Sequence, residues 1–445
     1  MESLGQYLKD AREELNLPLQ EVYNRTNIDV SLLSRIENGR RLPTKEQMQL
    51  LVKLYECDEH KSSVLLGIEK VLFTLDGNDE YKIEVIQSVS EKIKLGRITT
   101  LFPENYDIGQ KVFNIESRRY IGNKAKLTDW IMKIIHKHTN GFNSFFDVFA
   151  GTASVSKSAI PYTEKIIMND FLSSNNIIYQ AFFAQGEYNI SKLKSIIKDY
   201  NSINPDLLKD NYFSDNFGDK FFDYKNAKVI GYIRESIENK KNDLTTKEYA
   251  ILLASLIYSI DKIANTVGHF DAYFKRKIIY KPLLINLIKP LETKNVEIYK
   301  EDANLLAKNI NADVAYIDPP YNSRQYSRFY HLYENLIEWE KPELFGVAMK
   351  PKAKNMSAYC TSSAPTAFRD LIQKLNVKYI AVSYNNTYDS KSGSSKNKIT
   401  LEQIQSILEE RGTTYIYESE HKCFNTGKTE FENHKELLFI TEVKQ

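Results

Sequence analysis

The stretch SFFDVFAGTASVS, from Ser144 to Ser156, joins an apolar run to a turn of small residues and the start of a polar segment. Residues 144–150 have the aromatic and branched side chains of a buried strand. Gly151 and its small neighbours allow the backbone to approach a ligand closely, and a helix that starts after the turn presents its N-terminus to that ligand. This order of strand, turn and helix is typical of an α/β sheet with a ligand at its edge.

Six further segments have the composition of strands, and helix-like segments lie between them. The last two, TTYIYESEH and KELLFITEV, follow one another closely, as the strands of an antiparallel pair do. We therefore expect an α/β fold with one seven-stranded sheet. The strands are expected at residues 144–150, 164–170, 296–302, 313–319, 378–384, 413–421 and 435–443.

An acid stands at the end of the second expected strand. Asp170 follows the Gly151 turn by about 20 residues, where an acid can bind the two hydroxyls of a ribose. No GxGxxG motif accompanies the turn, which argues against a dinucleotide and its pyrophosphate. We expect a nucleoside cofactor, with S-adenosylmethionine as the foremost candidate, and we expect Asp147, Phe149 and Gly151 to line its site. The alternative is a tight strand–helix turn beside a surface acid.

A second motif, Asp318-Pro319-Pro320-Tyr321, ends the strand-like run that starts at residue 313. It should face the same crevice as the cofactor, because the carboxyl ends of parallel strands meet at one edge of a sheet. Proline supplies no N–H, so the Pro319 carbonyl can act as an acceptor beside the Asp318 carboxylate. Two acceptors can hold the two hydrogens of an amino group, while the Tyr321 ring stacks on the heterocycle. These residues predict direct methyl transfer to the exocyclic amine of a base, driven by positioning and electrostatics.

From about Phe113 to Val443 the chain resembles the Dam-like class of DNA adenine-N6 methyltransferases. Besides the two motifs above, RRYIGNKAKL (residues 118–127), YKEDANLL (299–306) and VSYNN (382–386) are similar to motifs of that family. The resemblance implies a Rossmann-like sheet and S-adenosylmethionine as the methyl donor. One departure is Ala153, which stands where the family usually has a second glycine and implies adjusted cofactor packing. The cofactor contacts implied in these motifs are Tyr120, Gly122, Lys124, Asp170, Asp302 and Asp318.

Residues 175–295 occupy the slot in which the family places its target-recognition region, and their composition predicts a mainly helical insertion. Within it, DKIANTVGHFDAYFKRK (residues 261–277) interleaves basic and aromatic residues, which suits a DNA backbone and an extruded base. A solvated basic helix end is the alternative. The DNA contacts expected in this domain are Asn265, His269, Lys275, Arg276, Arg324 and Tyr326.

The N-terminal residues 1–58 have the spacing of a small all-α domain, with helices expected at 4–16, 19–26, 30–38 and 43–57. Asn27 and Asp29 are suited to cap the helices on either side of a tight turn. Residues 19–44 resemble the repressor-type helix-turn-helix family, in which the third helix enters the major groove. A role in protein–protein packing is the alternative. The resemblance implies core positions at Leu19, Val22, Ile28, Leu33 and Ile36, base contacts from Val30, Ser31, Ser34 and Arg35, and phosphate contacts from Arg40 and Arg41.

The whole chain has 445 residues, more than one domain by length, and a net charge of +2, so a DNA surface must be a local patch. We expect a helix-turn-helix domain at 1–58, a helical connector at 59–110 and a methyltransferase domain at 111–445. Three scattered cysteines form no CxxC pair, and no metal site is expected. The apolar run of residues 249–260 is too short to span a bilayer, and the N-terminal residues do not have the pattern of a signal segment, which predicts a cytoplasmic protein without a membrane partner.

Together these features predict site-specific methylation of adenine N6 in double-stranded DNA. The enzyme would belong to a restriction–modification system, with a cognate endonuclease as partner, or act as an orphan methylase. Two alternatives stay open: methylation of cytosine N4 or of adenine in RNA, and a transcriptional regulator with a degenerate methylase half. The intact Asp318 motif, Lys124, Asp170 and Asp302 argue against the regulator.

Overall fold

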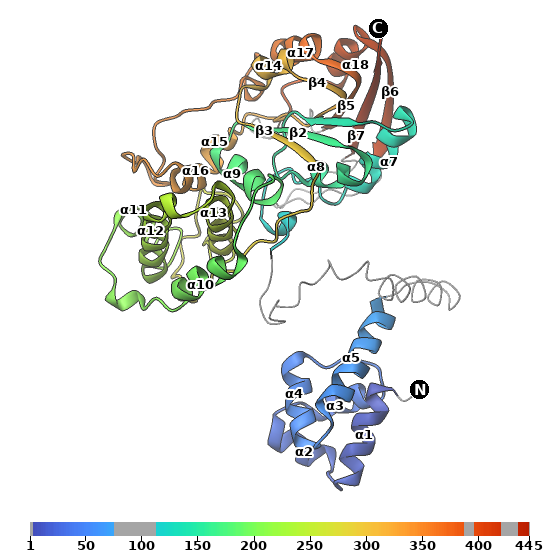
Figure 1. Ribbon diagram of the computed structural model, residues 1–445, viewed down its shortest axis with the longest axis vertical. Helices are drawn as coiled ribbons and strands as arrows, with labels where there is room; N and C mark the ends of the chain where they lie inside the picture. Colours follow the sequence, from blue (N-terminus) through green and yellow to red (C-terminus); the bar gives the residue numbers. More distant parts are fainter. Residues whose placement is uncertain (1–2, 75–112, 387–395, 420–434, 445) are drawn as a thin grey trace. The chain divides into compact units, whose positions relative to one another are not determined.

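The computed structural model describes residues 3–74, 113–386, 396–419 and 435–444 (Figure 1). The chain divides into two compact units, Met1–Ile108 and Gly109–Gln445. Residues 75–110 of the expected connector and the expected strand end at 420–421 lie outside the described residues. Within the described parts, every helix is too short or too polar to cross a membrane.

The described part of the N-terminal unit consists of five helices around a small core (Figure 1). Four of them are the expected helices, and the fifth begins in the stretch expected as a connector. Val22, Ile28, Leu33 and Ile36 are buried in the core as expected, whereas Leu19 is only partly buried. The helices are α1 Leu4–Glu14, α2 Leu19–Thr26, α3 Val30–Glu37, α4 Lys45–Leu54 and α5 Glu59–Thr74.

The turn between α2 and α3 has the expected caps. Asn27 ends α2 in the left-handed conformation, with φ of 56°, which Asn adopts more readily than most residues. The Asp29 carboxylate accepts the N–H groups of Ser31 and Leu32 at 2.8 and 3.3 Å, which caps the start of α3. The helix-turn-helix geometry is therefore specified locally by polar side chains as well as by the core.

A buried ion pair fastens α1 to α3. Arg12 donates to both carboxylate oxygens of Glu37, at 2.8 and 2.9 Å, and the Tyr55 hydroxyl donates to the same carboxylate at 3.4 Å. Gly5 allows the two backbones to meet, because a Cβ there would stand 2.6 Å from the Glu37 carbonyl oxygen. These contacts fix the orientation of α3 within its domain.

The described strands of the C-terminal unit form the expected seven-stranded sheet, in the order β3-β2-β1-β4-β5-β7-β6 (Figure 1). Neighbouring strands are parallel except around β7, which runs antiparallel to both β5 and β6. The first strand is shorter than expected because the turn toward Gly151 begins after Asp147. Strand placement reverses between β1 and β4, so a crevice forms at the carboxyl ends of these strands. The strands are β1 Ser144–Asp147, β2 Lys165–Asn169, β3 Asn295–Tyr299, β4 Asn311–Ile317, β5 Asn376–Asn385, β6 Gly412–Ser419 and β7 Glu436–Val443.

Helices cover both faces of the sheet (Figure 1). On one face Phe368 and Ile404 pack against Ile380 of β5, and on the other Ile131 and Val155 pack with Phe145 of β1. Burial of apolar side chains on both faces is the ordinary source of stability for a mostly parallel sheet. The covering helices are α14 Ala303–Leu306, α17 Ala364–Lys374 and α18 Leu401–Glu409 on the first face, and α7 Thr128–Thr139 and α8 Ser154–Ala159 on the second.

The insertion between β2 and β3 is mainly helical. Its centre is α13, which is buried along almost its whole length and contains the apolar run of residues 249–260. Residues 262–294, all of them described, follow α13 without forming a helix or a strand beyond one isolated bridge at Ile288. The helices are α9 Ser173–Phe182, α10 Ile190–Asn201, α11 Tyr212–Phe217, α12 Tyr224–Asn239 and α13 Thr246–Asp261, and α15 Tyr326–Phe329 and α16 His331–Glu338 follow β4.

Candidate active site

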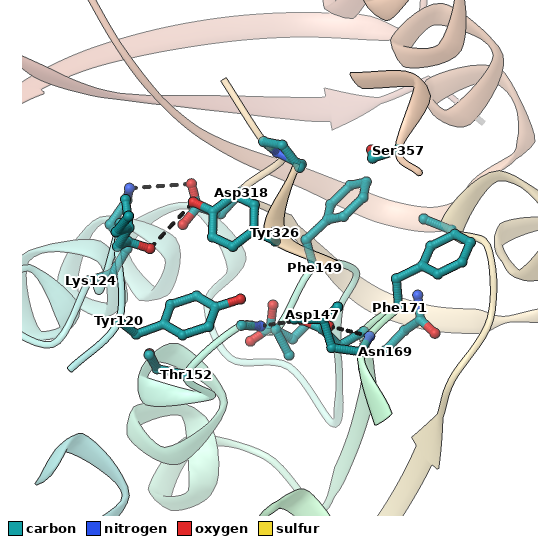
Figure 2. A pocket seen from close by; sticks show the side chains of 18 of the residues that line it. Tyr120, Lys124, Asp147, Phe149, Thr152, Asn169, Phe171, Asp318, Tyr326 and Ser357 are labelled. Carbon is teal, nitrogen blue, oxygen red and sulfur yellow. Dashed lines mark hydrogen bonds and ion pairs between the residues drawn. The ribbon is translucent and has the colours of Figure 1, made fainter. Parts of the chain in front are cut away.

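A cavity lies at the carboxyl ends of β1, β2 and β4 (Figure 2). In the described part of the chain, the structure brings all but one of the expected cofactor residues into its wall; the exception is Asp302. Tyr326, which we expected at the DNA, is also part of the wall. The expected residues that line the cavity are Tyr120, Gly122, Lys124, Asp147, Phe149, Gly151, Asp170 and Asp318.

The turn after β1 has two residues in the left-handed region. Gly151 has φ of 52°, and a Cβ there would stand 3.6 Å from the Tyr120 ring, which lines the cavity. Ala153 has φ of 56° and is fully buried, with its side chain packed in the core beside the sheet. The departure from glycine at Ala153 therefore affects backbone strain, at about 1 kcal/mol, more than the space available to a cofactor.

Asp147, at the end of β1, is a buried acid in the cavity wall. One of its oxygens accepts a hydrogen bond from the Ser156 hydroxyl at 2.6 Å. The other oxygen, Oδ1, has no hydrogen-bond partner among the described residues. Burial raises the pKa of Asp147 to about 7, against the opposing effect of the Ser156 hydrogen bond. A buried carboxylate oxygen of this kind is suited to bind a cationic group.

Asp170, at the end of β2, holds the turn that follows β1. Its carboxylate accepts the N–H groups of Gly151 and Leu172, at 3.0 and 2.8 Å, and the Tyr179 hydroxyl at 3.4 Å. Burial raises the pKa of Asp170, and hydrogen bonds from Leu172, Asn175 and Gly151 oppose that shift. A carboxylate has about four acceptor positions, so the oriented acid can still accept from a ribose.

Asp318 and Lys124 form an ion pair at the end of β4, and Figure 2 shows the two side chains pointing at one another. The Lys124 Nζ lies 3.2 Å from Asp318, 2.9 Å from the Tyr321 hydroxyl and 3.7 Å from Glu436. Burial raises the pKa of Asp318, although Lys124 and Tyr321 oppose it. Burial also lowers the pKa of Lys124, but attraction to Asp318 and Glu436 outweighs this, so the lysine stays charged. The lysine thus favours the carboxylate form of Asp318.

Tyr321 is anchored by its hydroxyl group. The hydroxyl donates to Asp318 and lies 3.2 Å from the Ser383 carbonyl oxygen of β5. Its ring meets the ring of Tyr384 edge to face, at 4.5 Å between centroids, and Lys124 lies over its face at 4.9 Å. Tyr384 belongs to the VSYNN motif, so the structure joins the two motifs. Stacking of Tyr321 on a target base stays a prediction.

The RRYIGNKAKL motif packs on the helices that follow the Asp318 turn. The Tyr120 ring stacks on Tyr330, at 4.5 Å and 6° between planes, and on Tyr326 at 5.5 Å. The Ile121 N–H donates to the Tyr330 hydroxyl at 2.9 Å. Gly122 has φ of 79°, and a Cβ there would stand 3.2 Å from the Tyr326 hydroxyl oxygen. The aromatic residues after the catalytic motif therefore support the cavity wall.

Asp302 has a different local role from the one expected. Its carboxylate accepts the N–H groups of Asn304 and Leu305, at 2.9 and 3.2 Å, and so caps α14. Its neighbours Glu301 and Ala303 line the cavity. Contact between Asp302 and a cofactor stays a prediction.

Phe171, Gln325 and Ser357 are among the cavity residues that the sequence did not predict as part of the cofactor site. Phe171 follows Asp170 directly, and an aromatic next to a ribose-binding acid was a usable signal. Gln325 lies in the catalytic motif, and its side chain exchanges two hydrogen bonds with the backbone of Ser357, at 3.0 and 2.8 Å. Ser357 itself lies outside every motif, and nothing in its local sequence indicated a place in the wall.

Residues 262–277, here called the recognition loop, contain the expected DNA contacts of the insertion. Lys275 and Arg276 are exposed. His269 is half-buried and stacks on Phe329 at 4.8 Å, and burial lowers its pKa. Asn265 is buried, and its amide donates to the carbonyl groups of Lys220 and Phe274 at 3.0 and 2.8 Å. The visible role of Asn265 is thus to hold the loop, and a direct DNA contact from it stays a prediction.

Arg324 follows the catalytic turn and is half-buried. Its backbone N–H donates to the Asn322 side chain at 3.1 Å, and its carbonyl accepts from the Cys360 thiol at 3.3 Å. The segment that bears Arg324 is therefore held on both sides, and a DNA contact from its side chain stays a prediction.

The expected DNA contacts of the N-terminal unit lie on α3 and just beyond its end. Ser31, Arg35, Arg40 and Arg41 are exposed. Ser34 is half-buried and accepts a hydrogen bond from the Asn38 side chain at 3.3 Å. Positions 31, 34 and 35 share one face of a helix because they are three and four residues apart. That face has the geometry of a recognition helix.

The fold and the site define a class of enzyme, and comparison with known proteins agrees. The family described as D12 class N6 adenine-specific DNA methyltransferase matches residues 120–388, and a helix-turn-helix domain family matches residues 3–63. The chain belongs to the D12 class of N6 adenine-specific DNA methyltransferases. The expected Dam-like family, its seven-stranded sheet and the N-terminal helix-turn-helix domain are thereby confirmed.

Several proteins named as type II methyltransferases are similar to about two thirds or more of this chain. Type II methyltransferase M.NlaIII of Neisseria lactamica is 30% identical over 73% of this chain and 98% of its own length. Type II methyltransferase M.CviAII of Paramecium bursaria Chlorella virus 1 is 29% identical over 73% of this chain and 98% of its own length. Type II methyltransferase M.FokI of Planomicrobium okeanokoites is 31% identical, and the match covers 67% of this chain but 48% of that protein. The protein is accordingly a DNA methyltransferase of the adenine class, and the cytosine, RNA and regulator alternatives are not supported.

Proposed function

We propose that the protein transfers a methyl group from S-adenosylmethionine to the N6 amino group of an adenine rotated out of duplex DNA. The observation that supports the proposal is that Asp147, Asp170 and Asp318 line one cavity. Among the described residues, the Oδ1 of Asp147 has no hydrogen-bond partner. The target base must leave the duplex because its amino group is otherwise paired.

The cavity residues fit the parts of this cofactor. Asp170 would accept hydrogen bonds from the ribose hydroxyls, and the Oδ1 of Asp147 would bind the ammonium group of the methionine part. Phe149 and Phe171 would flank its adenine ring. When bound, the cofactor supplies an electrophilic sulfonium methyl group.

The Asp318 turn would orient the acceptor amine. The Asp318 carboxylate and the Pro319 carbonyl accept one amine hydrogen each and draw the nitrogen toward a tetrahedral geometry. The nitrogen lone pair, delocalised into the ring in free adenine, then points away from the ring. Positive charge would develop on the nitrogen as it gains the methyl group and the donor leaves as a neutral thioether. The Asp318 carboxylate would stabilise this charge in a site of low dielectric and accept the N–H proton that the methylated nitrogen loses. Lys124 supports this step by favouring the ionised form of Asp318.

Tyr321 would stack on the extruded adenine. Its hydroxyl bonds to Asp318 and Ser383 fix the ring beside the catalytic carboxylate. The anchored ring would therefore bind the base without a large rearrangement. Exposed Lys275 and Arg276 of the recognition loop would contact the phosphates of the duplex around that base.

The proposal extends to the biological setting. The type II names of the relatives support a restriction–modification system with a cognate endonuclease, and a DNA substrate favours a cytoplasmic location. The helix-turn-helix domain would bind DNA through α3, either to regulate its own gene or to add affinity. Changing Arg40 and Arg41 to Ala in the full chain should weaken operator or substrate binding and leave the chemical step unchanged. An unchanged DNA affinity would favour a packing role for this domain.

The experiment that tests the proposal is methyl transfer from labelled S-adenosylmethionine to unmethylated duplex DNA, with mass spectrometry of the product nucleosides. We expect N6-methyladenine, and sequencing of the same DNA for modified positions would define the target. Labelled N4-methylcytosine, or DNA without label under conditions in which the cofactor binds, would contradict the proposal.

A further inference from the structure

Two adjacent arginines precede Tyr120, and their side chains contact different parts of the domain. Arg118 is 3% exposed, donates to Asn175 of α9 at 2.7 Å and lies over the Tyr120 ring at 4.9 Å. Asn175 in turn donates to the Tyr120 hydroxyl at 3.2 Å. Arg118 thus belongs to the support of the cofactor cavity.

Arg119 instead holds the start of the recognition loop. Its guanidinium donates to the carbonyl oxygens of Thr266 and Asp261, at 2.9 and 2.5 Å, and to the Asp261 carboxylate at 3.3 Å. Its backbone N–H donates to that carboxylate as well, at 3.3 Å. Gly268 has φ of 109°, and a Cβ there would stand 3.3 Å from the Arg119 side chain, so the loop packs closely on this arginine. A planar guanidinium that reaches a carboxylate and two carbonyl groups fixes orientation as well as distance.

The same contacts connect the loop to the catalytic turn. Asp261 is 2% exposed and also accepts the Tyr333 hydroxyl of α16 at 3.0 Å. Farther along the loop, the Phe270 N–H donates to the Phe329 carbonyl at 2.7 Å, and the Phe270 carbonyl lies 2.9 Å from the His331 Nε2. Helices α15 and α16 directly follow the Asp318 turn, so the loop is anchored on the elements that support the site.

We propose that Arg119 is a positioning residue that sets the recognition loop relative to the Asp318 turn and thereby determines how well the enzyme discriminates its target sequence. The inference rests on the proposed function, in which Lys275 and Arg276 of that loop contact DNA. Arg119 acts through the loop: DNA seated correctly against the loop places the extruded base at Asp318. A loosened loop would bind the duplex in several registers and transfer methyl groups at near-cognate sites.

The test is Arg119→Met in the full-length enzyme, with Arg369→Met as the matched control. Arg369 of α17 is half-exposed and pairs at 3.1 Å with Glu410, the residue that follows α18, away from the recognition loop in the fold. Four quantities are measured: the Kd for S-adenosylmethionine, the KM for duplex DNA, kcat, and the ratio of methylation at cognate and near-cognate sites by sequencing. We expect Arg119→Met to raise the DNA KM and lower the site ratio by about tenfold each, with the cofactor Kd changed by less than about twofold.

Two further variants keep the inference testable if Arg119→Met unfolds. Arg119→Lys keeps the charge but lacks the fork geometry, so its site ratio should fall between those of the wild type and Arg119→Met. Arg118→Met should show the opposite pattern, a raised cofactor Kd with an unchanged site ratio. A wild-type site ratio in a folded Arg119→Met or Arg119→Lys enzyme would overturn the inference.

Failure of the inference can be separated from failure of the proposed function. If changing Lys275 and Arg276 to Ala weakens DNA binding while Arg119→Met keeps its discrimination, only the role of Arg119 is wrong. If the loop variant binds DNA like the wild type, the proposed DNA contact of the loop is wrong, and the inference falls with it.

Discussion

The cavity at the sheet edge and the recognition loop are held by different kinds of contacts. In the cavity, carboxylates at strand ends bond to side chains of other segments, as Asp147 does with Ser156 of α8 and Asp318 with Lys124. The recognition loop is held by side chains that donate to backbone carbonyls, from Asn265 within the loop and from Arg119 outside it, while Lys275 and Arg276 stay exposed. The cavity residues are thus held by the strands of the sheet. The exposed loop residues can be substituted without loss of the hydrogen bonds that hold the loop.

We expect the greatest loss of activity when the ion pair of Lys124 and Asp318 in the cavity is removed. Lys124→Met removes the counter-charge of Asp318, and we expect kcat at saturating substrates to fall by about 100-fold or more, because the buried acid then favours its neutral form. Lys378→Met is the matched control. It removes the lysine that pairs with Asp313 at 2.7 Å near the start of the same strand, β4, and it should keep wild-type turnover. Equal kcat values for the two variants would contradict the proposed role of Lys124.

The second prediction concerns the pH dependence of cofactor binding. Asp147 has a raised pKa of about 7, so it is neutral below that pH and can bind an ammonium group only above it. Between pH 7 and pH 5.5, the Kd for S-adenosylmethionine should therefore rise by up to about tenfold for each unit of pH. Asp147→Asn should bind more weakly at pH 7.5 and show little change over this range. Titration calorimetry measures both curves, and parallel curves would exclude Asp147 as the ammonium ligand.

The third prediction concerns the two exposed basic residues of the recognition loop. Changing Lys275 and Arg276 to Ala should weaken DNA binding by about tenfold and reduce the slope of log Kd against log salt by about 2, because two phosphate contacts are lost. The Kd for S-adenosylmethionine should not change. Changing Lys240 and Lys241 to Ala removes the same charge from the exposed end of α12 and serves as the control. A control that weakens DNA binding equally would show a general charge effect in place of a loop contact.

The fourth prediction concerns Ala153 in the turn after β1, where we expect little change. Ala153→Gly relieves the left-handed strain but removes a buried methyl group, and these effects nearly cancel to within about 1 kcal/mol of unfolding free energy. The Kd for S-adenosylmethionine should stay within about twofold, since the methyl group packs in the core. Chemical denaturation and calorimetry check the two values. A tenfold tighter Kd would mean that the methyl group does intrude on the cofactor.

The sequence was sufficient for the parts of the molecule that depend on local pattern. The five interior strands are apolar runs that the sheet and its helices bury, whereas the edge strands β3 and β6 are more exposed and were located by their aromatic and branched residues. Asp170 and Asp318 were predictable for a similar reason, because an acid directly after a buried strand faces the edge of the sheet. The caps at Asn27 and Asp29 are also local, since each acts within a few residues of itself.

The remaining features depend on partners that are distant in the sequence. Arg119 and Asp261 are 142 residues apart, and Gln325 and Ser357 are 32 apart, so neither pairing follows from a motif. Asp302 shows a related limit: its carboxylate caps the helix that begins beside it, a role that its motif did not indicate, and its contact with a cofactor stays a prediction. Asn265 lies in a stretch whose composition predicts DNA contacts. It is buried, and its side-chain amide donates to two backbone carbonyls. Tertiary packing decides such roles, and it is not encoded in any short stretch.

The most direct test of the account is the behaviour of Asp318→Ala in a single turnover with bound S-adenosylmethionine and duplex DNA. Glu436, 3.7 Å from the Lys124 Nζ, still offers the lysine a partner in this variant. For Asp318→Ala we expect the cofactor Kd to stay within about tenfold of the wild-type value. We expect the rate of methyl transfer to fall by at least about 1,000-fold. Transfer at the wild-type rate would contradict the assignment of Asp318 as the acceptor that orients the amine.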